Sequence, residues 1–198
     1  MILKKITNMK QLQIFIESLL DAPDDTNMDK NMVISWLKQH TDCDFNVDDN
    51  LNVSVRNFHM WLNDGESIPE CIVWEKTNNF SLHIGLEQKV DKLVLSNLPP
   101  VMGGFIIVCN KVETLVIDCP HLSSIDSMEV NSSSLKEIIL PKGIKVKNMN
   151  LLSVPELENI ENVEKVKLID LSMTTGCRFA RKSIKFSGKI TVNGFGPY

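Results

Sequence analysis

The apolar residues of the first 40 positions recur at helical spacing. Over 8–21 they fall on one face, with an asparagine at the start and Pro23 just past the end, which predicts an amphipathic helix. A second helix is predicted over 26–40, because it opens with capping-box spacing and again carries its apolar residues on one side. Joined by residues 22–25, the two would form an N-terminal helical hairpin.

The period of the pattern then changes from helical to two. Apolar and polar residues alternate over 43–55, which predicts short strands with one buried face. Two further strands are predicted at 71–74 and 80–84, separated by a turn-prone Asn-Asn pair. Residues 1–88 are therefore expected to form a small α+β domain.

One six-residue phrase recurs in the second half of the chain, with apolar residues at its first, fourth and sixth positions. The copies lie at 90–95, 112–117, 135–140 and 163–168, so their starts are nearly evenly spaced. A single coil of this kind buries too little apolar surface to be stable alone, whereas stacked coils build a continuous core. Residues 89–198 are therefore expected to form an irregular leucine-rich-repeat-like β-solenoid, and the fold class is predicted to be α+β.

Two further features bear on the solenoid. Weaker strand patterns fall between the copies, at 105–108, 128–130 and 147–151, so some coils are expected to have strands on two faces. The motif Pro-x-Leu-x-x-Ile occurs at both Pro120 and Pro155. The competing interpretation is that so short an apolar phrase arises by chance in any β-rich chain. The nearly regular spacing and the shared motif favour the solenoid.

Parts of this region resemble known repeat families. Residues 132–144, Ser-Ser-Ser-Leu-Lys-Glu-Ile-Ile-Leu-Pro-Lys-Gly-Ile, resemble the bacterial surface-antigen type of leucine-rich repeat. Residues 99–115, in which Gly-Gly-Phe-Ile-Ile-Val-Cys leads into Asn-Lys-Val-Glu-Thr-Leu, are similar to the repeat of uncharacterised tailed-phage proteins. The repeat length departs from both patterns, and no clean consensus continues after residue 141. The resemblance implies a recognition scaffold of bacterial or phage origin without an associated activity.

Charge is distributed unevenly along the 198 residues. Residues 1–134 carry 10 basic and 19 acidic residues, a net charge of −9, and residues 135–198 carry 11 and 6, a net charge of +5. The total of −4 argues against a dedicated nucleic-acid-binding protein. A local basic patch remains near the end of the chain, at Arg178, Arg181, Lys182, Lys185 and Lys189.

Two interpretations of this basic segment compete. Phe179 and Phe186 lie among the basic residues, an arrangement that would suit a nucleic-acid groove with base stacking. The alternation over 184–192 instead predicts two short strands about a Ser-Gly turn. Such a hairpin would cap the exposed end of the solenoid, and this second interpretation is favoured.

No sequence motif selects a metal, a cofactor or a catalytic residue, and none is expected. Residues 42–50 begin like a calcium loop, but Val47 and Val53 occupy the positions that require glycine and glutamate. Cys119 and His121 lack the further ligands of a tetrahedral zinc site. Five cysteines without a recognisable leader are expected to be reduced thiols in a cytoplasm. No stretch has the length and apolarity of a membrane span.

The fifth position of the repeated phrase provides the candidate interaction site. It is expected to face outward, because the fourth and sixth positions face the core. Its occupants are Val94, Val116, Ile139 and, in the fourth copy, Lys167. Three stacked aliphatic residues would form an apolar stripe, and an exposed apolar patch marks an interface. The alternatives are that the N-terminal hairpin covers the stripe or that these strands are buried on both sides.

Together these features favour a non-enzymatic module that binds another protein. With the resemblance, the concrete expectation is a phage accessory protein that binds and inhibits a bacterial host factor used in defence, acting in the host cytoplasm. One alternative is a structural component of a virion or assembly, and another is an enzyme with a site scattered over loops. A homo-oligomer is compatible with each. Neither nucleic acid nor a membrane is expected as a partner.

Overall fold

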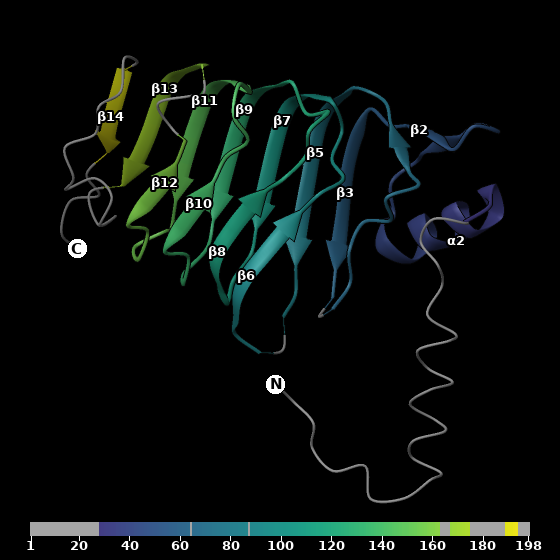
Figure 1. Cartoon of the computed structure of the whole chain (residues 1–198), viewed down its shortest axis with the longest axis horizontal. Helices are drawn as coiled ribbons and strands as arrows, with labels where there is room; N and C mark the ends of the chain where they lie inside the picture. Colours follow the sequence, from purple (N-terminus) through teal and green to yellow (C-terminus); the bar gives the residue numbers. More distant parts are fainter. Residues whose placement is uncertain (1–27, 64, 87, 163–166, 175–188, 194–198) are drawn as a thin grey trace, which may run out of the picture.

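Strands make up most of the described chain, as seen in a computed structural model that describes residues 28–63, 65–86, 88–162, 167–174 and 189–193. Figure 1 shows them side by side along the long axis of the molecule, with helix α2 (Lys30–His40) at one end. Among the described residues no helix is long and apolar enough to cross a membrane.

A seven-stranded sheet, here called the long face, runs the length of the molecule, and all its neighbouring strands are parallel. In spatial order its strands are β3 (Asn57–Leu62), β5 (Thr77–Ile84), β7 (Val101–Val108), β9 (Ser124–Asn131), β11 (Lys145–Leu152), β13 (Lys167–Thr174) and β14 (Lys189–Asn193). Buried and exposed residues alternate over the whole of β3, and β7, β9 and β11 likewise carry both buried and accessible side chains. The long face therefore has one side in the core and one side open.

Shorter strands form the opposite side, here called the short face, which is divided into two sheets. One is parallel throughout and contains β6 (Val90–Leu95), β8 (Val112–Ile117), β10 (Glu137–Ile139) and β12 (Asn159–Glu161). The other contains β1 (Asn46–Val47), β2 (Asn52–Ser54) and β4 (Val73–Trp74), in which β1 and β2 are antiparallel. No pairing joins β4 to β6, so the short face is interrupted there.

The chain alternates between the two faces and so winds into a β-solenoid of about five turns. Val90, the first residue of one copy of the phrase, pairs with Val112, the first residue of the next. Thr114 and Glu137, which share the third position of their copies, pair in the same way. This regular advance places equivalent side chains of successive coils one above another.

Stacked apolar side chains fill the interior. One ladder runs through Phe58, Phe80, Phe105, Met128 and Met149, which are paired in register and at most 2% exposed. Leu115 and Ile138 approach from the short face and are fully buried. Full burial stabilises each such side chain by about 1.5–3 kcal/mol relative to exposure, so the ladder is the main source of stability.

Helix α2 covers the β3 end of the stack and packs against β1 and β3. Its N-cap is Asp29, whose Oδ1 accepts a hydrogen bond from the Met32 N–H at 2.9 Å. The helix therefore begins at Lys30 rather than near residue 26 as predicted, because the second residue of the predicted capping box is itself the cap. The predicted first helix at 8–21 lies outside the described residues, and the structure gives no support for a helical hairpin.

The repeated phrase is confirmed in three of its four copies, because 90–95, 112–117 and 135–140 stack in register. The prediction that 163–168 provides the fourth copy in this stack is wrong. The segment that pairs with β10 is β12, with Ile160 opposite Ile138, whereas Lys167 and Leu168 belong to β13 in the long face. Strands on two faces of the coils, predicted from the weaker patterns, are confirmed by β7, β9 and β11.

The predicted domain boundary and the predicted C-terminal cap can be compared with the observed strands. The boundary at residue 88 falls between β5 and β6, and the long face continues across it through the pairing of β5 with β7. At the other end, β14 adds a parallel strand to β13. The first strand and turn of the predicted capping hairpin, residues 184–188, lie outside the described residues.

Candidate binding surfaces

The predicted apolar stripe of Val94, Val116 and Ile139 lies on the short face and faces outward, and we call it the short-face stripe. Val94, Val116 and Ile139 are aligned in register; Val94 is 45% exposed and the other two are half-buried. The next residue in the column is Glu161, so an acidic side chain ends the stripe. Lys167 does not join it, because this residue pairs with Lys145 in the long face.

The predicted basic patch lies mostly outside the described residues, which include none of Arg178, Arg181, Lys182 and Lys185. Lys189 is described and is the first residue of β14. It is in register with Asp170 of β13, so the one described member of the patch has an acidic residue beside it on the sheet.

A second accessible surface lies on the long face and was not predicted from the sequence. We call it the outer patch and define it as His59, Trp61, His83, Ile106 and Val108. These residues come from three neighbouring strands. Trp61 pairs in register with His83, and His83 with Val108, so the three form one column across the strands, here called a register column. Trp61 is 37% exposed and Ile106 is 39% exposed. The patch therefore combines aromatic and aliphatic side chains on a rigid sheet.

Two histidines form the centre of the outer patch. The rings of His59 and His83 are tilted against each other with centroids 4.6 Å apart, and His59 meets the edge of Trp61 at 6.2 Å. Partial burial, and then the charge of a protonated His59, lower the pKa of His83 below its ordinary value. The shift favours the neutral form of His83, which suits this part of the patch to an apolar partner.

The character of the long face changes beyond β7. The register column that contains Ile106 continues to Glu129 and Asn150. These polar side chains replace the apolar ones, so the outer patch has a defined edge. It was missed because β3 was not predicted as a strand, although the alternation over Asn57–Leu62 is the signal that would have revealed it.

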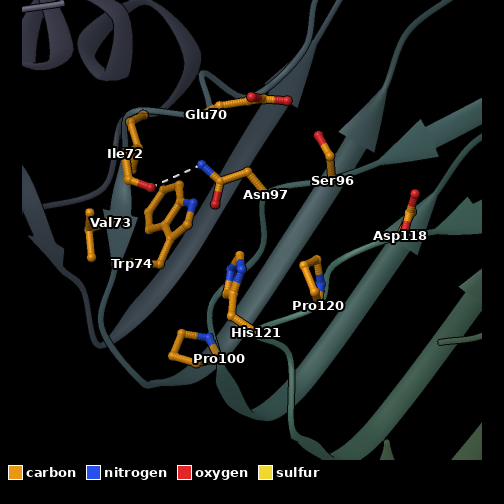
Figure 2. Close-up of a pocket in the computed structure, with 10 residues that line it drawn as sticks. All are labelled: Glu70, Ile72, Val73, Trp74, Ser96, Asn97, Pro100, Asp118, Pro120 and His121. Carbon is orange, nitrogen blue, oxygen red and sulfur yellow. Dashed lines mark hydrogen bonds between the residues drawn. The ribbon is translucent and has the colours of Figure 1, made fainter. Parts of the chain in front are cut away.

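A groove opens where the short face is interrupted. It has a cavity volume of about 650 Å³ and lies between β4 and the corners that follow β6 and β8 (Figure 2). Its walls are formed by Glu70, Ile72, Val73, Trp74, Ser96, Asn97, Pro100, Asp118, Pro120 and His121. A cavity of this size is in the range of small-ligand sites.

Hydrogen bonds fix the polar groups of this groove. The Asn97 Nδ2 donates to the backbone oxygens of Pro69 at 2.6 Å and Ile72 at 3.0 Å. His121 Nε2 lies 2.7 Å from the Leu98 oxygen, which identifies Nε2 as the protonated nitrogen. Trp74 is only 4% exposed, and its Nε1 has no hydrogen-bond partner among the described residues.

Cys119 and His121 meet beside the groove but are not arranged as a nucleophile and its base. Their Sγ and Nε2 atoms are 3.3 Å apart. However, Nε2 donates to the Leu98 oxygen and cannot accept the thiol proton at the same time, and Nδ1, the nitrogen that can accept, lies 3.8 Å from the Sγ atom. Burial raises the pKa of the Cys119 thiol, which keeps it protonated.

The acidic segment that resembled a calcium loop has a local structural role. Asp48 Oδ1 accepts hydrogen bonds from the Asn50 and Asn52 N–H groups at 2.8 and 2.9 Å, and Oδ2 accepts one from Asn52 Nδ2 at 2.7 Å. These bonds, that of the Asn52 side chain first, lower the pKa of Asp48. The carboxylate therefore organises the turn into β2. Among the described residues, no group of three or more His, Cys, Asp or Glu side chains is placed to hold a metal ion.

No protein-family model, curated protein or solved structure matches the chain. The structure establishes a β-solenoid, and the predicted kinship with bacterial or phage repeat proteins stays a prediction.

Proposed function

We propose that this protein is a non-enzymatic protein-binding module that contacts its partner through the outer patch. The observation that carries the proposal is that Trp61, His83 and Ile106, from three neighbouring strands, are exposed on the same open side of the long face. Exposed aromatic side chains held rigidly lose little conformational entropy on binding, and they are enriched among residues that dominate interface energetics.

The parallel sheet supports this role because it presets the geometry of the patch. The backbone of β5 is paired on both sides, by β3 and β7, and the side chains beneath the patch are fully or almost fully buried. A partner would therefore meet a preformed surface rather than a loop that must be ordered. The short-face stripe is a second candidate surface, favoured by the exposure of Val94.

The partner class that we propose is a protein with a complementary apolar surface. The finer proposal, a phage accessory protein that inhibits a host defence factor, rests on the repeat resemblance alone. It predicts that the captured protein is a bacterial host component, whereas an assembly component would instead be recovered with purified particles.

The test is quantitative affinity capture from the organism that produces the protein, using matched glutamate substitutions. Ile106→Glu places a charge in the outer patch, and Asn150→Glu places the same charge further along the same register column. Val94→Glu charges the short-face stripe. Circular dichroism and thermal unfolding establish that each variant is folded before capture is compared.

We expect Ile106→Glu to lower recovery of the partner at least about tenfold, because a buried unpaired charge at an interface is strongly unfavourable. Asn150→Glu and Val94→Glu should bind like the natural protein. Loss with Val94→Glu alone would assign binding to the stripe. Equal recovery with all three folded variants would contradict both surfaces.

A further inference from the structure

We propose that the groove beside β4 binds an arginine-like group, in which a methylene stem joins a guanidinium cation to the part of the molecule that carries a carbonyl oxygen. The site is separate from the outer patch and does not depend on it. Within the part of the chain that the structure describes, three features of the groove carry the proposal: one buried donor without a partner, several acceptors, and two carboxylates without a cation.

The unpartnered donor is the indole N–H of Trp74. The ring is held in place by edge-to-face contacts with Phe58 and Phe80, at centroid distances of 5.5 and 5.4 Å. Figure 2 shows its nitrogen on the ring edge that faces Asn97. Buried donors in native proteins are almost always satisfied, and an acceptor supplied from the groove would satisfy this N–H. A ligand carbonyl is such an acceptor.

The other polar side chains of the groove, including the Ser96 hydroxyl, can accept hydrogen bonds. Asn97 uses its amide nitrogen for two backbone carbonyls, and Figure 2 shows its side-chain oxygen turned toward Trp74 and His121. Because His121 donates through Nε2, its Nδ1 is an acceptor in the neutral ring, where it lies 3.8 Å from the Cys119 Sγ. A ligand rich in donors therefore fits this wall, and a guanidinium group carries five.

The charge of the groove selects a cation. Glu70 and Asp118 are exposed at its rim, and neither forms an ion pair with a described residue. The described lining residues include no lysine or arginine. Pro100 and Pro120 add apolar surface against which the methylene stem of an arginine would pack. The complementary ligand is thus positively charged at one end and apolar along its stem.

The test is an NMR titration with Nα-acetyl-L-arginine methylamide, followed through the indole N–H signals of the three tryptophans. The Trp74 signal is assigned by its absence in Trp74→Phe. Two further probes separate the components of the proposal: the uncharged isostere Nα-acetyl-L-citrulline methylamide, and butylguanidinium, which has no carbonyl. Free L-arginine distinguishes a small-molecule ligand from a residue within a peptide.

We expect a saturable shift of the Trp74 signal with the arginine amide. The double variant Glu70→Gln/Asp118→Asn, which alters only exposed groups, should weaken binding on the order of tenfold or more. Asp126→Asn, an exposed acidic residue outside the groove, should leave it unchanged.

Each other outcome overturns a stated part of the inference. Equal binding of the citrulline probe would show that the groove does not require a cation. Equal binding of butylguanidinium would show that it does not require a carbonyl acceptor. An unshifted Trp74 signal at saturating probe, or unchanged affinity in the folded double variant, would exclude the groove as an arginine site.

Discussion

Buried polar side chains at the corners of the solenoid hydrogen-bond to the backbone of a neighbouring coil. The Ser132 hydroxyl donates to the Cys109 oxygen at 2.7 Å, and Asn162 Nδ2 donates to the Leu140 oxygen at 3.0 Å. Thr77 similarly donates to the Arg56 oxygen at 3.0 Å. At corners the sheet no longer satisfies the backbone, so these residues replace the missing ladder bonds and keep successive coils aligned.

Cys109 should make the stability of the protein depend on alkaline pH. Its side chain is fully buried, and burial raises the pKa of the thiol from an ordinary value of 9.0 to about 11. Between these values the unfolded chain has lost the thiol proton while the folded chain retains it. Stability therefore falls as pH rises from about 9 to about 11, by up to about 3 kcal/mol.

Urea unfolding at pH 8, 9.5 and 10.5 measures this effect. Cys109→Ala is the matched control, because it removes the titrating group while the partly exposed Cys43 and Cys71 remain. The variant should be less stable at pH 8, owing to lost packing, and should approach the natural protein as pH rises. A constant difference between the two proteins across this range would refute the pKa assignment.

At the scale of elements, the alternation and the repeated phrase predicted most of the solenoid strands but not their full register. The fourth phrase was misplaced because β12 departs from the pattern at its end. Asn162 stands where earlier copies have an aliphatic residue, and it has a positive φ of 63° while bonding to the preceding coil. The apolar segment that follows resembles the phrase more closely, although its last residues belong to the opposite face.

The candidate surfaces were harder to predict from the sequence than the strands were. The short-face stripe followed from the phrase alone, because its three members occupy one repeated position. The outer patch required the register of β3, β5 and β7, which brings Trp61, His83 and Val108 together from separate coils. The groove depends on the missing pairing between β4 and β6, and no local pattern encodes such an interruption.

The Gly103-Gly104 pair lies inside β7, although a glycine pair is more typical of a corner between strands. A Cβ atom on Gly103 would stand 2.5 Å from the Asn78 backbone oxygen of the adjacent coil. Gly103→Ala should therefore force the two coils apart and destabilise the protein by about 1–3 kcal/mol. Gly85→Ala is the control, since its Cβ would meet only the Leu62 oxygen at 3.9 Å.

Chemical denaturation of both glycine variants provides the comparison. A Gly103→Ala protein as stable as Gly85→Ala would mean that β5 and β7 do not approach as closely as the structure indicates.

At the scale of the whole molecule, the solenoid exposes the open sides of its two faces while helix α2 covers the sheet edge at β3. Helix α2 covers the β3 end, where the Thr41 hydroxyl also donates to the His59 oxygen. The Cys43 Sγ accepts a hydrogen bond from the His59 N–H at 3.3 Å. Such blocking of an edge strand prevents unwanted pairing with other chains, so binding is directed to the open sides of the faces.

If the coils are modular, removing one whole coil should leave a folded and shorter protein. Deletion of residues 112–134 removes everything from the start of one copy of the phrase to the start of the next, and these copies are equivalent because they pair in register. It would place β11 against β7, with Met149 and Leu151 in the positions now held by Met128 and Val130. These apolar side chains preserve the ladder, so cooperative unfolding and the β circular dichroism spectrum should persist at a lower melting temperature.

Deletion of residues 112–123 tests the same principle by removing about half a coil. It takes out β8 and keeps β9, so the next strand of the long face would follow β7 with no strand of the short face between them, and no folded solenoid is expected.

The whole-coil deletion also separates the two binding proposals. It retains every residue of the outer patch but removes Asp118, Pro120 and His121 from the groove. Capture of the protein partner should therefore survive while the arginine probe no longer binds, and loss of the fold in the whole-coil deletion would show that these coils do not stack as interchangeable units.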